Sequence, residues 1–201
     1  MKLIIITGPS GSGKTSLAVK LSQELKYSQI ISTDDFYKTG IISKIFSEII
    51  NSYFDKYISH NNKLLKNYIY KILKNKRINY FYKYDFKKKS TTIDFRNSGN
   101  IETLIIEGIF TLEFIKYISK YNYLLIKLDP YRDLCLKRIF YRDQIERGKN
   151  KNKVEKDFRN AWEIYKIKEK FYKKIDHKNQ LMFKKDPDIN TILKEINNLN
   201  H

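Results

Sequence analysis

The chain has 201 residues, with 40 basic and 22 acidic side chains and a formal net charge of +18. This length fits one compact domain with a small insertion, and contents of 41% hydrophobic and 14% aromatic residues exclude a mostly disordered chain. A single cysteine, Cys135, excludes a disulfide scaffold and a cysteine-clustered zinc site. The charge surplus, taken alone, favours a nucleic-acid binder.

The N-terminal part of the chain alternates between apolar and amphipathic segments. Residues 2–7 are almost entirely apolar, which is typical of a buried strand in a parallel sheet. Residues 14–26 carry leucines at helical spacing, and residues 29–32 form a second candidate strand. The order strand, helix, strand indicates an open α/β sheet.

The stretch 41–100 interrupts this alternation and holds much of the charge surplus, with twelve basic and three acidic side chains in residues 51–100. We interpret most of the surplus as a solvated surface, because blocks of like charge are usually exposed. The stretch itself is expected to form a lid or a substrate-binding insertion. Its predicted elements are helices at 41–50 and 61–75, an aromatic, strand-like run at 78–86 and a polar loop at 87–100 that could fold as a hairpin.

Alternation of strands and helices resumes after residue 100, and its spacing predicts a parallel sheet. Gly148 would directly follow one of the helices, at a position where glycine is common. The predicted elements are strands at 104–106, 123–128 and 180–183 and helices at 111–120, 131–147, 153–176 and 188–198.

A glycine-rich motif joins the first predicted strand to the first predicted helix and fits G-x-x-x-x-G-K-S/T without a mismatch. Glycines let backbone N–H groups surround phosphate oxygens, and the following helix adds the positive end of its dipole. Lys14 would reach the β- and γ-phosphates and assist their chemistry, while the Thr15 hydroxyl would coordinate Mg²⁺. The predicted phosphate site consists of Gly8, Pro9, Ser10, Gly11, Ser12, Gly13, Lys14 and Thr15.

Such a loop occurs in kinases, GTPases and motor ATPases. The guanine-specificity motif Asn/Thr-Lys-x-Asp does not occur in the sequence, which argues against a GTPase. No second large ATPase region follows, which argues against an oligomeric motor. Both exclusions favour a kinase.

Carboxylates are expected at the carboxyl ends of the strands, where ligands bind in an open α/β sheet. Asp34 follows the second strand and could accept a hydroxyl proton or bind Mg²⁺, but it could equally cap a helix. For Asp35, capping and turn formation are favoured. Glu107 ends the third strand, the usual place for an acid that organises Mg²⁺, with a solvent-facing strand end as the alternative.

Arginines recur on the helix predicted at 131–147. Arg138 and Arg142 are four residues apart and share a helical face. Their guanidinium groups could hold phosphates and stabilise the transferring phosphoryl group. The alternative is ion pairing along the helix, with Asp143 among the available acids.

Five motifs, in this order, resemble the uridine kinase family of P-loop kinases. The resemblance runs from residue 1 to about residue 183, and its last motif is the one most particular to uridine kinases. The motifs are Gly8–Thr15, Ile31–Lys38, Tyr84-Asp85-Phe86, Ile105–Ile109 and Arg142–Gly148.

The resemblance implies a P-loop NTPase fold of the α/β class, with a central five-stranded parallel sheet flanked by helices. It implies one kinase domain over residues 1–201, with an acceptor-binding insertion at 41–100 and a helical lid region at 131–160. The implied activity is phosphorylation of the 5′-hydroxyl of uridine or cytidine, with ATP or GTP as donor and Mg²⁺ as cofactor. A homo-oligomer is also implied, although no pattern in the chain bears on it.

Roles follow from the resemblance residue by residue. Asp34 matches the family's general base near the metal, and Glu107 matches the metal-site acid beside Thr15. Arg142 and Arg147 match lid arginines that hold phosphates, and Arg147 is also expected to contact the substrate. The matched acceptor-binding positions are Tyr37, Asp55, which follows Phe54, and Tyr84.

The acceptor pocket departs from the family more than the nucleotide motifs do. Residues 55–61 lack the usual proline and second aspartate, and the histidine that helps to read the pyrimidine would fall near Lys89. Related kinases for nicotinamide riboside or pantothenate therefore stay open. A basic nucleic-acid-binding NTPase is a third hypothesis, but no nucleic-acid-binding motif supports it.

The remaining features favour a cytoplasmic protein that does not enter a membrane. Residues 3–6 are far shorter than the apolar core of a signal peptide, and no run approaches the ~20 apolar residues that span a bilayer. The unpaired cysteine predicts a reducing compartment. Cys135 and Trp162 are expected to pack helices, and the histidines are expected at the surface, namely His60, His177 and His201.

Overall fold

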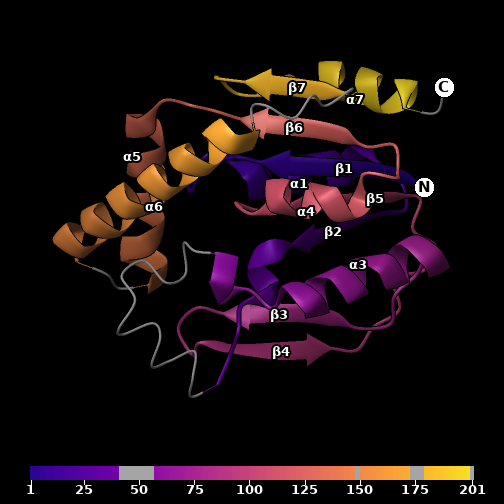
Figure 1. Ribbon diagram of the computed structural model, residues 1–201, viewed down its shortest axis with the longest axis horizontal. Coiled ribbons are helices and arrows are strands. Elements are labelled where there is room, and N and C mark those ends of the chain that lie inside the picture. Colours follow the sequence, from indigo (N-terminus) through magenta and orange to yellow (C-terminus); the bar gives the residue numbers. More distant parts are fainter. Residues whose placement is uncertain (41–56, 148–149, 173–178, 200–201) are drawn as a thin grey trace.

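The computed structural model describes residues 1–40, 57–147, 150–172 and 179–199 (Figure 1). At its centre lies a five-stranded parallel sheet with the strand order β2-β5-β1-β6-β7, which confirms the predicted fold class. The strands are β1 (Lys2–Thr7), β2 (Ser28–Ser32), β5 (Thr103–Glu107), β6 (Leu124–Leu128) and β7 (Gln180–Phe183).

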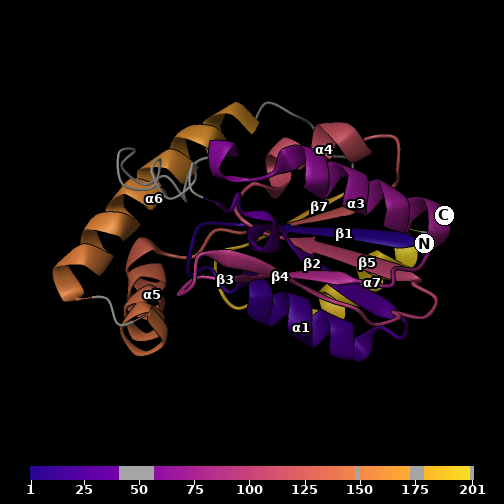
Figure 2. The same cartoon turned by 90° about the horizontal axis from the view of Figure 1, so that it is seen from below.

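The three central strands are apolar on both faces because helices cover both sides of the sheet (Figure 2). Strands β5 and β6 are buried along their whole length, and β1 is buried from Leu3 onward. The strand register aligns Ile6 with Glu107 and Thr7 with Lys127. The carboxyl ends of these strands therefore meet at one edge of the sheet, where the loop after β1 begins.

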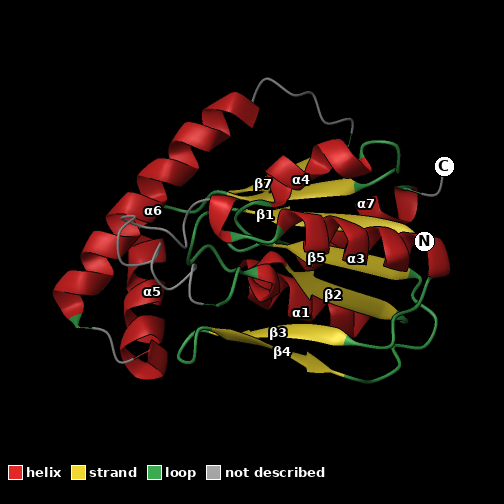
Figure 3. Ribbon diagram, turned by 60° about the horizontal axis from the view of Figure 1, so that its bottom comes forward, coloured by secondary structure: helices red, strands yellow, loops and turns green. Residues whose placement is uncertain are grey.

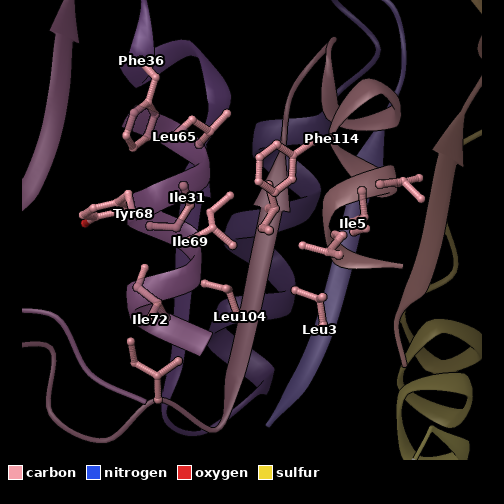
Figure 4. Close-up of a cluster of buried hydrophobic side chains, with 14 of the residues drawn as sticks. Leu3, Ile5, Ile31, Phe36, Leu65, Tyr68, Ile69, Ile72, Leu104 and Phe114 are labelled. Atoms are coloured by element: carbon pink, nitrogen blue, oxygen red, sulfur yellow. The ribbon is translucent and has the colours of Figure 1, made fainter. Parts of the chain in front are cut away.

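The helices on the two faces are α1 (Lys14–Glu24) and α7 (Ile189–Asn198) on one, and α3 (Asn62–Asn75) and α4 (Thr111–Ile118) on the other. On the first face, Leu21 of α1 and Ile192 of α7 share a buried core with apolar side chains of β1 and β6. On the second face, Ile69 of α3 packs toward Leu104 of β5 (Figure 4). The sheet is thus held between two apolar cores.

The strand-like run at 78–86 and the start of the predicted polar loop at 87–100 fold together as a hairpin. Strands β3 (Phe81–Asp85) and β4 (Ser90–Asp94) pair antiparallel, and β3 packs against the 3-10 helix η1 (Thr33–Phe36) that follows β2. The Phe36 ring lies 5.2 Å from that of Tyr82 in the hairpin and 5.3 Å from that of Tyr68 in α3, between ring centroids. The helix predicted at 41–50 lies outside the described residues, and a short 3-10 helix, η3 (Tyr57–Ser59), precedes α3.

Two helices, α5 (Arg132–Arg147) and α6 (Lys151–Tyr172), form an arm that extends beyond the carboxyl ends of the strands (Figures 1 and 3). Cys135 and Ile139 of α5 pack against Val154 and Phe158 of α6, with Trp162 beside them. The packing roles predicted for Cys135 and Trp162 are confirmed. Among the described residues, no helix combines the length and apolarity that a membrane crossing requires.

Candidate active site

The loop between β1 and α1 is packed so tightly that side chains do not fit at two of its glycines. A Cβ on Gly8 would come within 2.5 Å of the Leu128 carbonyl oxygen, and one on Gly11 within 2.5 Å of the Cys135 carbonyl oxygen. Gly11 also has φ +77°, a left-handed value that favours glycine. Gly13 precedes α1 without a side-chain cap, which leaves the N-terminal N–H groups of the helix for an anion.

Lys14, the first residue of α1, reaches back into this loop. Its buried Nζ donates a 2.9 Å hydrogen bond to the Pro9 carbonyl oxygen. Burial lowers the pKa of Lys14, against the opposing effect of Glu107 and Asp34. The Ser12 hydroxyl is also buried and makes no hydrogen bond within the described part of the chain. A buried cation and a buried hydroxyl are suitable partners for phosphate oxygens, so the loop fits a nucleotide phosphate.

Glu107 lies at the end of β5, where it is 3% exposed and accepts a 3.3 Å hydrogen bond from the Thr15 hydroxyl. The solvent-facing alternative for Glu107 is therefore wrong. Burial and the charge of Asp34 raise the pKa of Glu107, while Lys14 opposes them. The described residues hold no cluster of three or more His, Cys, Asp or Glu side chains that could bind a metal. A Mg²⁺ ion at this place would thus need the Thr15 hydroxyl and phosphate oxygens as ligands beside carboxylates.

The segment after β2 gives two neighbouring carboxylates different surroundings. Ser32 caps η1, because its Oγ accepts a 3.4 Å hydrogen bond from the Asp34 N–H. The capping role considered for the aspartates is therefore wrong. Asp35 instead binds the hairpin: its Oδ1 accepts a 3.1 Å hydrogen bond from the Tyr84 N–H. Burial raises the pKa of Asp35 to about 6, although the Tyr84 bond opposes this rise.

Asp34 belongs to the charged group around the phosphate loop. Burial is the main cause of the pKa shifts of Lys14 and Glu107, and the charge of Asp34 also contributes to both. The three side chains therefore lie within electrostatic reach of one another. Close backbone packing supports this arrangement. A Cβ on Gly108 would lie 1.8 Å from the Thr33 Oγ1, so only glycine lets the end of β5 pass this close to η1.

An aromatic group lies next to η1, and we name it the aromatic wall: Tyr37, His60, Tyr84, Phe86 and Phe110. The Tyr37 ring centroid is 4.2 Å from that of His60 and 5.1 Å from that of Tyr84, and His60 is 4.7 Å from Phe110. His60 is 1% exposed, so its prediction as a surface residue is wrong. A β-bridge between Tyr37 and His60 brings it inside, and the polar sequence around His60 carries no local signal of this burial.

Arg138 and Arg142 lie on α5 beside the phosphate loop. Arg138 donates a 3.4 Å hydrogen bond to the Ser12 carbonyl oxygen and pairs with Asp186 at 3.3 Å. Arg142 pairs with Asp143 at 2.9 Å, and its charge adds to the burial that lowers the pKa of Lys14. Ion pairing within α5 is thus confirmed for Arg142, whereas Arg138 pairs with an acidic residue outside α5.

Other predicted positions are only in part described. Asp55 and the side chain of Arg147 lie outside the described residues, and their roles stay predictions. Tyr37 and Tyr84 meet in the aromatic wall. Lys89 lies in the turn between β3 and β4, where it is exposed and has φ +50°.

Comparison with known proteins gives matches over most of the chain. The sequence model of the family described as Phosphoribulokinase / Uridine kinase matches residues 3–185. Uridine kinases from Borrelia turicatae and Borrelia hermsii are 31% and 30% identical to the chain over 159 residues, which is 77% of this chain and 73% of each relative.

Solved structures share the fold at lower identity. A protein from Bacillus stearothermophilus described as a possible uridine kinase has a TM-score of 0.61 at 18% identity, over 90% of this chain and 88% of its own. YFH7 from Saccharomyces cerevisiae, described as a P-loop kinase with a circular permutation, has a TM-score of 0.73 at 11% identity, over 92% and 93% of the two chains. At these identities the structures support the fold alone.

Proposed function

The chain belongs to the phosphoribulokinase and uridine kinase family, and from this premise we propose that it transfers a phosphoryl group from ATP or GTP to the 5′-hydroxyl of uridine or cytidine. It is accordingly a phosphotransferase with an alcohol acceptor. The product would be the nucleoside monophosphate, a step of pyrimidine salvage in the cytoplasm. The observation that carries the proposal is the meeting of Lys14, Asp34 and Glu107 at the phosphate loop.

On the donor side, the phosphate loop and the arm would hold the nucleotide. Backbone N–H groups of the loop and the Lys14 ammonium would bind the β- and γ-phosphates. Arg142 and Arg147 would neutralise the charge that develops on the transferring phosphoryl group. Arg138 keeps α5 against the loop through its bond to the Ser12 carbonyl oxygen. Most of the rate enhancement would come from positioning and electrostatics.

On the acceptor side, Asp34 would take the proton of the 5′-hydroxyl as the phosphoryl group is transferred. Asp55 would bind the ribose, and the rings of Tyr37 and Tyr84 would pack against the base. Thr15, Asp34 and Glu107 would hold Mg²⁺, which when bound neutralises charge on the donor phosphates.

One observation favours a second candidate, a kinase for another small alcohol such as nicotinamide riboside or pantothenate. The exposed hairpin turn carries Lys89 near the position where the resemblance calls for a pyrimidine-reading histidine. Ring packing against an aromatic wall accepts many planar rings, so it does not select a pyrimidine. Nicotinamide riboside offers such a ring, whereas pantothenate does not.

A coupled ADP- or GDP-release assay tests both candidates. The panel contains uridine, cytidine, purine nucleosides, nicotinamide riboside and pantothenate, each with ATP and with GTP as donor. We expect turnover with uridine or cytidine, and a Lys14→Ala variant should lose turnover with every acceptor. Turnover confined to another alcohol would show that this alcohol, and not uridine or cytidine, is the acceptor. Nucleotide hydrolysis stimulated only by RNA or DNA would favour the nucleic-acid-binding NTPase.

A further inference from the structure

The C-terminal half of α6 is attached to β6 through a buried group of charges. Lys127 of β6 and Glu169 of α6 form an ion pair in which the side chains are 8% and 3% exposed. Lys166, one turn earlier on α6, pairs with Glu169 at 2.9 Å and with Asp129 at 2.8 Å. We name these four residues, Lys127, Asp129, Lys166 and Glu169, the root cluster.

The root cluster fixes the position of α6 because its members depend on one another. Burial alone would raise the pKa of Glu169, but the ammonium groups of Lys127 and Lys166 outweigh burial and hold that pKa below its ordinary value. Removing one partner of such a pair leaves a buried charge uncompensated. The charges are therefore satisfied only when α6 lies in this place on the sheet.

A further contact ties the same part of α6 to the acceptor side. Lys168 donates a 2.5 Å hydrogen bond to Glu113 of α4, and its Nζ lies 4.3 Å from the ring centroid of Phe110. Phe110 belongs to the aromatic wall, where its ring meets His60. Lys127, for its part, is in register with Thr7, the residue just before the phosphate loop. The end of α6 thus contacts the aromatic wall at Phe110 and the strand next to β1, which leads into the phosphate loop.

The other helix of the arm is seated on the phosphate loop. A Cβ on Gly11 would meet the Cys135 carbonyl oxygen and, at 3.0 Å, the Ile139 side chain. The apolar core around Cys135 and Val154 joins α5 to α6. Arg142 therefore extends from α5, which rests on the loop and packs against α6, and α6 is anchored at the root cluster.

We propose that Glu169, held by Lys127 and Lys166, is a positioning residue for phosphoryl transfer: it fixes the end of α6 on β6 and thereby sets where α5 presents Arg142. The chemical part of this inference rests on the proposed function, whereas the mechanical link between α6 and α5 does not. A displacement of about 1 Å at a transferring group is enough to cost ~100-fold in rate.

Kinetics of Glu169→Gln test the positioning role, with Glu163→Gln, an exposed site on the same helix, as the matched control. We expect kcat per folded active site to fall about 10- to 100-fold, while the Kd for ATP stays within about threefold because Lys14 and the loop are intact. The Glu163→Gln enzyme should behave as the parent. An unchanged kcat, with only a lower Tm, would make the root cluster merely structural and overturn the proposal.

A double-mutant cycle asks whether Glu169 acts through Lys127. Lys127→Met should reproduce the fall in kcat, and the double variant should be no slower than the slower single variant. Independent effects, in which the two reductions in kcat multiply, would contradict a shared role.

Hydrogen exchange separates this inference from the proposed acceptor. In the ATP-bound protein, Glu169→Gln should speed exchange of backbone amides in α6 and also in α5, since the two helices share one apolar core. Faster exchange confined to α6 would overturn the inference even if uridine is phosphorylated. Coupled exchange in both helices would support it even if the acceptor panel shows no turnover.

Discussion

Single residues at the phosphate loop carry charges that are buried and mutually compensated. Lys14 and Glu107 are 8% and 3% exposed, and an isolated charge at such depth would be strongly unfavourable. Their opposite signs reduce that penalty without removing it, because burial keeps the pKa of Lys14 lowered, and burial together with the like charge of Asp34 keeps the pKa of Glu107 raised. We expect donor phosphates and Mg²⁺ to complete the balance.

Asp34→Asn removes the proposed proton acceptor and keeps the size of the side chain. We expect kcat to fall by at least ~100-fold, while the Kd for ATP in the absence of Mg²⁺ changes little because the loop backbone and the Lys14 side chain are retained. Isothermal titration with ATP and steady-state kinetics measure the two quantities, and Asp133→Asn at an exposed position of α5 serves as control. Retention of most of the turnover would refute Asp34 as the base.

Asp35 makes a pH-dependent contribution to folding. Burial raises its pKa from 3.8 to about 6 in the folded protein, so the fold favours the protonated form. This stabilising contribution is present below about pH 4 and is lost as the pH rises through about 6.

Asp35→Asn imitates the protonated carboxyl and keeps an oxygen for the Tyr84 N–H. The variant should therefore gain about 1–2 kcal/mol in free energy of unfolding at pH 8 relative to the parent, with a smaller gain at pH 4.5. Urea unfolding at both pH values measures the difference, with the exposed Asp94→Asn as control. Equal gains at the two pH values would show that titration of Asp35 is not the cause.

Among the elements, the phosphate loop is shaped as much by α5 as by its own sequence. Gly11 contacts the backbone of α5 at Cys135, and Ser12 accepts a hydrogen bond from Arg138. Gly99, in contrast, has a similar φ of +70° but no atom within 4 Å of the Cβ that it would carry. Substitutions at Gly99 therefore test backbone strain alone, whereas substitutions at Gly11 test strain together with steric collision.

Gly11→Ala should cost roughly 1–3 kcal/mol in free energy of unfolding from backbone strain alone and should also weaken ATP binding, because the new Cβ pushes the loop away from α5. Gly99→Ala should show the strain without loss of ATP binding. Denaturant unfolding and ATP titration compare the two variants. An unchanged Kd for ATP in Gly11→Ala would mean that contact with α5 does not shape the phosphate site.

For the molecule as a whole, the net charge of +18 attracts anionic nucleotides. The excess resides mainly in residues 51–100 and 151–201, not in the segment with the phosphate loop. This distribution favours a general electrostatic effect over a dedicated nucleic-acid surface.

Ionic strength should therefore act differently on the two substrates. The KM for ATP should rise severalfold between about 0.05 and about 0.5 M NaCl, because salt screens the surface charge. The KM for uridine, which is neutral, should stay within about twofold. Kinetics at several salt concentrations measure both values, and parallel increases would point to a salt effect on the fold instead of steering.

Local patterns were enough to predict the sheet, the phosphate loop and most helices. The apolar run at residues 2–7 predicts a central strand, because a strand that is apolar on both faces must be covered on both sides. The phosphate-loop motif is recognised from its own glycines, which the backbone needs in order to surround a phosphate. Helix starts are harder to predict: α6 begins at Lys151, whereas the pattern predicts a start at residue 153, and residues 173–176 of that prediction lie outside the described part of the chain. Exposed charged residues at the start of a helix leave no periodic mark of where it begins.

What the sequence alone determined is therefore the fold class, the phosphate site and the family resemblance, since these depend on neighbours in the chain. Only the tertiary structure decided that His60 is buried against Tyr37, that Asp35 binds the hairpin, and that Lys127 pairs with Glu169. These contacts join residues tens of positions apart. Their formation depends on how strands and helices close around the core, and no local spacing encodes that closure.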